Sequence, residues 1–328
     1  MTLQPDEQMT QSEVQIQRLG RFQLLAVLFS LMLTLLLSAL DQTIVGTALP
    51  RIIADLQGFD LYPWVLTAYL LASTTMVPIV GKLSDQFGRK WFLLASVLVF
   101  LVGSILAGSS QTMENLIFFR GLQGLGAGSA QTLCFTIVAD LFPPTERARW
   151  TGIFTAIFGF ASVIGPAAGG WITDHWGWRW AFYINLPLAA VAFVALLIWL
   201  PRMHLLQGTG ERGWAAVRQI DLLGSLTVAG ATICLLLGLS WGGQTFSWTS
   251  WQVIGTLSAS CVLFIIFFLA ERRAQEPILP LSLLRNQIFA ASALLTLLIG
   301  MALLALTVYI PLFIQAVQGN CQETWCQI

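Results

Sequence analysis

The sequence predicts an all-α membrane protein, and two observations lead to this fold class. Of 328 residues, 56% are apolar and only 10% are charged, whereas soluble domains carry roughly 25% charged residues. Nine apolar runs are long enough to cross a hydrocarbon core as helices, which takes about 20 residues each. The bilayer is therefore the expected solvent for most of the chain.

The expected membrane spans follow one another with short connections. They are residues 22–49, 62–81, 91–110, 115–138, 149–172, 179–200, 219–241, 251–270 and 288–313. The first span follows a polar segment, residues 1–21, and is too long for the apolar core of a signal peptide.

Lysine and arginine residues predict the orientation, because they accumulate on the cytoplasmic side of a membrane. With the N-terminus inside, 13 of the 16 basic residues fall in cytoplasmic segments, while Arg51 and Arg179 are outside. Tryptophans at 176–180 and 241–251 then lie at the outer interface, where they serve as anchors.

We expect a multi-pass protein of the inner or plasma membrane, in contact with lipid. The net charge of zero argues against nucleic acid as a partner.

Two charged residues fall inside spans. Asp41 lies about 12 Å deep in the first span and Arg120 about 8 Å deep in the fourth, both counted from the same side. One reading is a buried ion pair that fixes helix packing. The other is that at least one of them carries protons or faces the cargo, since ionisable residues inside membranes mark pathways. Protonation of Asp41 would release the arginine and shift the balance between states.

Small residues mark close helix contacts. Glycines recur through the fourth span, and the fifth span contains Gly165, Pro166, Gly169 and Gly170, with small residues four positions apart. Such spacing lets helix backbones approach closely, and Pro166 is expected to kink its helix. Simple packing explains any single glycine equally well.

A short inner loop joins the second and third spans. Gly81 and Gly88 are expected to permit a tight turn, while Asp85 and Arg89 are placed for charge contacts at helix ends. The plain reading is a positively charged hairpin.

This loop resembles the signature G-x-L-x-D-x-x-G-R-K of the major facilitator superfamily, with Gln86 where arginine is common. Further segments resemble the fourteen-helix branch of drug:proton antiporters. These segments are residues 40–50, where Gly46 replaces the usual asparagine, 120–124, 165–170, 178–180 and 184–187. Together the similarities extend over roughly residues 25–315.

The resemblance implies a helical bundle with about nine of fourteen membrane helices present. Residues 22–200 would form the N-terminal six-helix half, 201–218 a cytoplasmic loop, 219–270 two extra helices and 271–319 the start of the second half.

It also implies roles for single residues. Asp41 would be a protonation or cation-recognition site, Arg120 proton-linked, and Asp85 with Arg89 an inner gate in which Asp140 pairs with Arg89. The antiporter motif at 165–170 would serve helix packing. The energy source would be the proton gradient, without a cofactor.

Three functional hypotheses remain. The first is proton-coupled efflux by alternating access, with small lipophilic compounds, including cations, as cargo. Tyr69, Gln123 and Gln131 are candidates for lining the cavity, although each also suits ordinary packing. The second is a truncated fragment that transports nothing or binds partners, because residues 320–328 depart from the family pattern. The third is a facilitator or importer of a small organic solute.

An enzyme is not expected. Residues 238–242 match G-x-S-x-G but lack the strand-to-helix context of that motif, and no H-E-x-x-H occurs. The five cysteines lack zinc-type spacing, so no metal site is expected. Cys321 and Cys326 are a hypothetical disulfide if the tail reaches an oxidising compartment.

Overall fold

The structure is a computed structural model that describes residues 20–200, 222–243 and 245–272, together with parts of 286–301. Two compact units divide the chain, residues 1–270 and 271–328. In the second unit the described residues include a helical stretch within 287–301. The expected ninth span, 288–313, therefore lies largely outside the described residues. The tail at 320–328 lies wholly outside them.

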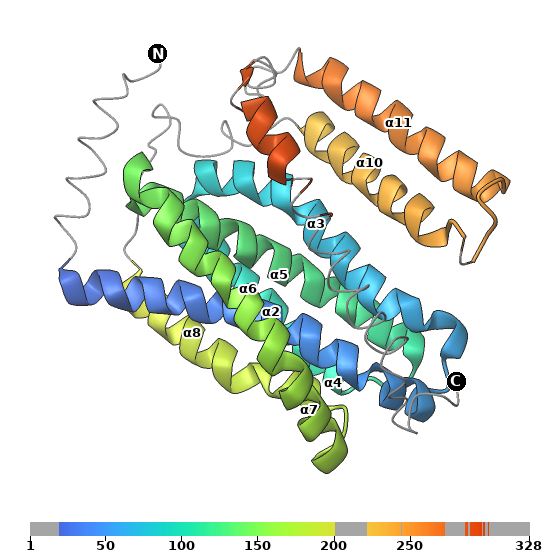
Figure 1. Ribbon diagram of the computed structural model, residues 1–328, viewed down its shortest axis with the longest axis horizontal. Helices are drawn as coiled ribbons and strands as arrows, with labels where there is room; N and C mark the ends of the chain where they lie inside the picture. The colour runs from blue at the N-terminus through green and yellow to red at the C-terminus, as the bar shows by residue number, and fades with distance from the viewer. Residues whose placement is uncertain are drawn as a thin grey trace, which may run out of the picture. The chain divides into compact units, whose positions relative to one another are not determined.

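Among the described residues as far as Glu271, all regular elements are helices, apart from one isolated bridge at 242 and 246. They are α2 (Arg21–Leu56), η1 (Phe59–Leu61), α3 (Tyr62–Phe87), α4 (Arg89–Gly108), α5 (Met113–Leu141), α6 (Pro144–His175), α7 (Trp180–Tyr183), α8 (Asn185–Trp199), α10 (Leu222–Trp241) and α11 (Trp251–Glu271) (Figure 1). This confirms the all-α class. Most helices extend past the predicted spans, because a helix need not end where its apolar run does.

Among the described residues, seven helical segments are long and apolar enough to cross a membrane. They correspond to the first eight of the nine predicted spans, without the fourth. Helices α7 and α8 together form one of these segments. The fourth span corresponds to α5, which has 29 residues but carries Arg120, Gln123 and Gln131 along its length. Because Arg120 and Gln123 are fully buried within the bundle, α5 is polar where it contacts other helices.

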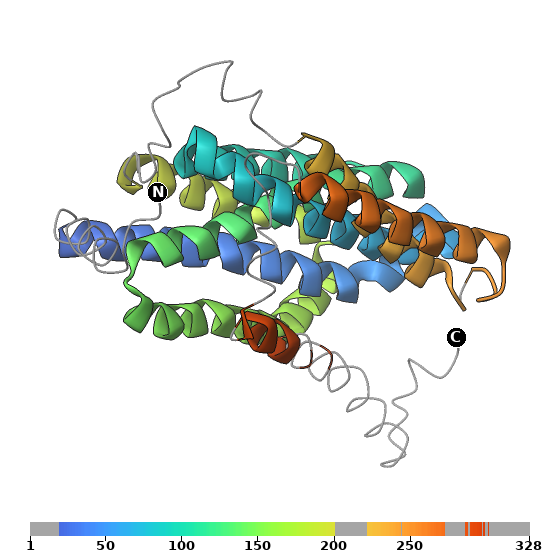
Figure 2. The same ribbon diagram turned by 90° about the horizontal axis from the view of Figure 1, so that it is seen from above.

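Close packing of the first six spans positions the interior. α5 lies against α3 and α4, while α2 lies against α6 and α8. In the view of Figure 2, α2 runs between α6 and the layer that contains α3 and α5. α10 lies beside α3, where the Trp64 and Trp241 rings are 6.1 Å apart.

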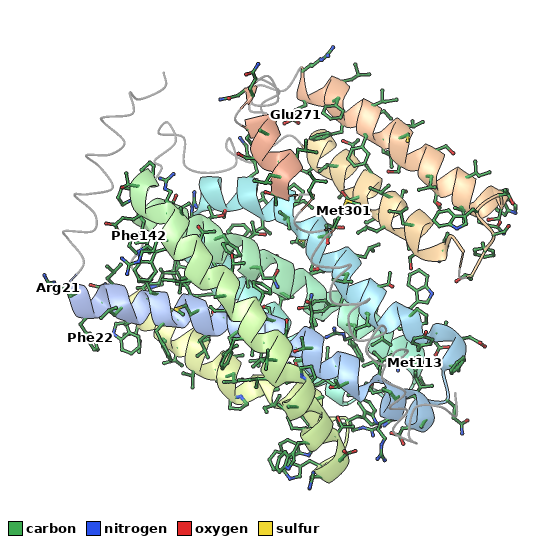
Figure 3. The ribbon with its side chains drawn as sticks, viewed as in Figure 1. Arg21, Phe22, Met113, Phe142, Glu271 and Met301 are labelled. Carbon is green, nitrogen blue, oxygen red and sulfur yellow. The ribbon has the colours of Figure 1, made fainter. Side chains whose placement is uncertain are left out.

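Two apolar clusters fill this interior, one toward each end of the helices. Met113 belongs to one cluster and Phe142 to the other, and they mark the two ends of α5 in Figure 3. Asp41 lies in α2 between Leu37, which belongs to the cluster of Phe142, and Ile44, which belongs to the cluster of Met113. The charged site is therefore enclosed by apolar layers on both sides along the helix axis.

Glycines decide how closely the helices approach. A Cβ atom added to Gly165 of α6 would collide with Thr43 of α2. One added to Gly169 would collide with Thr47 and Ile44 of the same helix. This confirms close contact for that spaced pair, whereas Gly170 faces open space. Pro166 lies within α6, which continues from residue 144 to 175.

The turn between α3 and α4 corrects one expectation. Gly88 has a φ of 94°, which favours glycine, so it forms the turn as predicted. Gly81, however, lies inside α3 and takes no part in the turn. The helix continues through Phe87 because the polar loop sequence after Gly81 is still compatible with helical backbone.

Candidate functional site

Asp41 and Arg120 meet in the centre of the bundle. Arg120 Nη1 lies 2.5 Å from Asp41 Oδ2, and both side chains are 0% exposed. α2 supplies the carboxylate and α5 the guanidinium, from positions 79 residues apart in the chain. Asp41 and Arg120, which the sequence places at similar depth, are thus in direct contact.

Two side-chain amides complete the surroundings of the carboxylate. Gln123 Nε2 donates to Asp41 Oδ1 at 2.8 Å, and Asn185 Nδ2 donates to the same oxygen at 2.9 Å. Gln123 Oε1 also accepts from Arg120 Nη1 at 2.8 Å. Both amide side chains are fully buried. The ionised carboxylate therefore accepts charge-assisted hydrogen bonds on both oxygens, which is the strong class of hydrogen bond.

Arg120 has further partners besides the carboxylate. Its guanidinium carbon lies 4.2 Å from the centre of the Tyr69 ring and 5.9 Å from that of Phe182. Its Nε donates to the Val65 carbonyl at 3.4 Å. Its Nη2 is buried and makes no hydrogen bond to any described residue. Aromatic faces thus compensate part of the desolvation of this cation.

Ser104 of α4 connects the two amides to the backbone. Its Oγ donates to the Phe182 carbonyl at 2.9 Å and accepts from Gln123 at 3.2 Å and from Asn185 at 3.1 Å. We call the set of Asp41, Tyr69, Ser104, Arg120, Gln123 and Asn185 the Asp41 cluster. It draws side chains from α2, α3, α4, α5 and α8.

The three proposed cavity residues have different positions. Tyr69 and Gln123 belong to the Asp41 cluster and are 1% and 0% exposed. Gln131 lies further along α5 and is half-buried. A pocket of about 470 Å³ lies elsewhere, at the ends of α2 and α6, where it is lined by Arg51, Asp55 and Arg179, among others.

At this end of the bundle, Trp178 corrects the expectation of a membrane anchor. Its side chain is only 5% exposed, and its Nε1 donates to Asp55 at 2.8 Å. Arg179 also pairs with Asp55, at 2.9 Å. Trp176 and Trp180 are about half exposed, as interfacial anchors are.

At the opposite end, Arg89 and Asp140 form the expected ion pair. Arg89 Nη1 lies 2.7 Å from Asp140 Oδ2, and the side chains are 11% and 20% exposed. The pair connects the start of α4 to the end of α5. Asp85 lies in the last turn of α3, and its side chain is outside the described part of the structure. The gate role of these residues stays a prediction.

Sequence reasoning missed two members of the Asp41 cluster, Ser104 and Asn185. Asn185 belongs to the segment 184–187, which the sequence marks only by its resemblance to the antiporter branch. A polar residue at the start of an apolar run was a usable signal for Asn185, since buried polar groups need partners. Ser104 gave none, because serines are common in apolar spans and usually bond to their own helix.

These observations define a multi-pass helical membrane protein with an ion pair sealed in its interior. The sequence matches the Major Facilitator Superfamily over residues 31–320, and the chain belongs to that family. Membership in this transporter family confirms that the chain is not an enzyme.

The chain is similar to proteins named for multidrug resistance, multidrug transport and efflux. It is 42% identical over 294 residues to Multidrug resistance protein 3 of Bacillus subtilis, covering 90% of this chain and 56% of the relative. It is 40% identical to the Multidrug transporter protein MdtP of the same organism, covering 88% of this chain and 52% of the relative. The Efflux pump dotC of Dothistroma septosporum is 38% identical, with coverages of 89% and 50%. The chain thus spans about half the length of the curated relatives it matches.

Among solved structures, a bacterial homologue of the human lysosomal transporter Spinster, inward-facing and unoccupied, aligns with a TM-score of 0.44. The sequence identity is 19%, over 81% of this chain and 67% of that chain. This likeness is too distant to support an argument.

Proposed function

We propose that the chain belongs to a proton-coupled antiporter that exports small organic compounds, and that Asp41 is its proton-binding residue. The observation that carries the proposal is the fully buried pair of Asp41 and Arg120. An ion pair in a membrane interior is costly, and its retention there is explained if its charge changes during a transport cycle. The drug-export relatives support small organic cargo.

Protonation would alter the balance of forces on Arg120. With Asp41 ionised, the guanidinium has a counter-ion and the carboxylate has three donors. With Asp41 neutral, Arg120 is a buried cation without a counter-ion, which is strongly unfavourable. A state in which Arg120 gains water or another anion then becomes favoured. A lipophilic cation would compete with the proton for the same carboxylate, which is the coupling that antiport requires.

The remaining roles extend this proposal. The Arg89–Asp140 pair would stabilise the state in which the inner side is closed, and the N-terminus would be cytoplasmic. Membership of the fourteen-helix antiporter branch rests on the motifs in the sequence. Alternating access would involve two halves that rock around a central site.

Orientation is tested by cysteine labelling. On a background without native cysteines, Gln111→Cys, between α4 and α5, should react with an impermeant maleimide added outside. Thr145→Cys, at the start of α6, should react only after the membrane is opened. The reverse pattern would overturn the assigned topology.

Transport is tested in everted vesicles with a lipophilic cationic dye and an imposed proton gradient. We expect the 328-residue chain to drive dye movement, Asp41→Asn to abolish it, and Asp60→Asn to retain it. Asp60→Asn is a matched control because Asp60 lies exposed in η1. Dye movement equal to that of empty membranes for the unaltered chain would contradict transport by this chain.

Proton coupling is tested separately by binding. Adding tetraphenylphosphonium to purified protein in weak buffer should release protons, and Asp41→Asn should release none. Equal release from both proteins would exclude Asp41 as the exchanging site, whatever the transport result.

A further inference from the structure

The two amides of the Asp41 cluster are engaged differently. Gln123 uses both ends, since Oε1 accepts from Arg120 and Nε2 donates to Asp41. Asn185 uses only its nitrogen, which donates to Asp41 and to Ser104. Its Oδ1 is buried and has no hydrogen-bond partner among the described residues. A buried acceptor without a partner is unusual enough to need an explanation.

Ser104 cannot take the place of either amide. Its hydroxyl carries one proton, and that proton is directed to the Phe182 carbonyl at 2.9 Å. Its lone pairs accept from both amide nitrogens. The hydroxyl therefore holds the nitrogen of Asn185 toward the carboxylate while Asp41 is ionised.

A proton on Asp41 would belong on Oδ1. Oδ2 faces Arg120 Nη1 at 2.5 Å, and a guanidinium can only donate. Oδ1 faces the amide nitrogens of Gln123 and Asn185, which are also donors. The neutral carboxyl therefore needs one of these amides to present an oxygen instead. Gln123 cannot do so without losing its bond to Arg120.

We propose that Asn185 is a positioning residue whose amide turns over when Asp41 binds a proton. It donates to the ionised carboxylate through Nδ2, and it accepts from the neutral carboxyl through Oδ1, the atom that now lacks a partner. Because Oδ1 then faces Ser104 Oγ, the Ser104 hydroxyl turns its proton from the Phe182 carbonyl to Oδ1 in the same step. The turn is a rotation about the terminal side-chain bond, which is soft in asparagine. This inference rests on the proposed function, because it requires that Asp41 take up a proton.

The surroundings identify Asp41 as the group that triggers this turn. Within the described part of the chain, the titratable groups that face it are Arg120 from α5 and Tyr69 from α3. α4 and α8 contribute the uncharged Ser104 and Asn185 to the cluster. In α6 the charged residues lie in the first two turns and the last, away from Gly165, which contacts α2.

Infrared difference spectroscopy between acidic and alkaline pH tests the inference on the full 328-residue chain in lipid. The carboxylic acid C=O band of Asp41 is identified by its loss in Asp41→Asn. In Asn185→Leu we expect this band at higher frequency, because the acid loses its acceptor. Asn185→Ser should return it toward the original position, since a hydroxyl can donate or accept. Asn115→Leu, the same change at an exposed site, should leave it unmoved.

A second measurement observes the asparagine amide in the unaltered chain and uses a substitution only to assign its band. With asparagine amides carrying ¹³C, acidification should lower the frequency of one labelled C=O band, and Asn185→Ser should remove that band. An unmoved Asp41 band in Asn185→Leu, or the absence of a label-sensitive band, would overturn the turning amide alone. The absence of any Asp41 acid band would overturn the proposed proton site as well.

Discussion

Replacing Arg120 by methionine tests the energetics of the buried pair most directly. The substitution keeps a long apolar side chain but leaves the Asp41 carboxylate without its counter-ion in a site that is 0% exposed. Breaking such a pair costs about 3–5 kcal/mol of unfolding free energy. Asp41 retains the donors of Gln123 and Asn185, so we expect a loss of about 3 kcal/mol, at the low end of this range.

The double variant Asp41→Asn with Arg120→Met separates charge from shape. Because it removes both charges, we expect it to recover most of the loss, as neutral replacements of buried pairs do. Reversible unfolding in mixed micelles, followed by tryptophan fluorescence, measures all three proteins. An Arg120→Met variant within about 0.5 kcal/mol of the unaltered chain, or a double variant no more stable than the single one, would refute the reasoning.

Three further predictions concern other contacts of the bundle. Gly128→Val should lower the unfolding free energy by about 1–3 kcal/mol through overpacking, because an added Cβ meets the Ser73 backbone. Gly121 faces open space on the same helix, so Gly121→Ala should leave the unfolding free energy unchanged or raise it. Arg89→Met should increase proteolysis near the start of α4, and exchanging the charges of Arg89 and its aspartate partner should reverse this; an unchanged digestion pattern contradicts a joining role. Arg51→Ala, which removes an exposed ion pair, should change the unfolding free energy by less than about 1 kcal/mol, since exposed pairs contribute little. A larger loss that does not depend on salt would contradict this prediction.

Several features of the bundle could be predicted from the sequence because they depend on position along one helix. The apolar runs predicted the helices, and the rise per residue placed Asp41 and Arg120 at similar depth. The spacing of Gly165 and Gly169 predicted a close contact, which α2 supplies. The turn predicted at Gly81 does not form, because a glycine in a polar segment can continue a helix as well as end one.

The sequence by itself determined the membrane class, the order of the helices and the presence of an acid and a base in the interior. Hydropathy and the cost of burying charge act locally and can be read along the chain. Only the tertiary structure decided how the carboxylate is held. Asn185 reaches Asp41 across 144 residues, and Ser104 reaches Asn185 across 81. Such contacts depend on which helix faces pack together. This packing is why Gln123 has both ends of its amide bound, while the oxygen of Asn185 has no partner among the described residues.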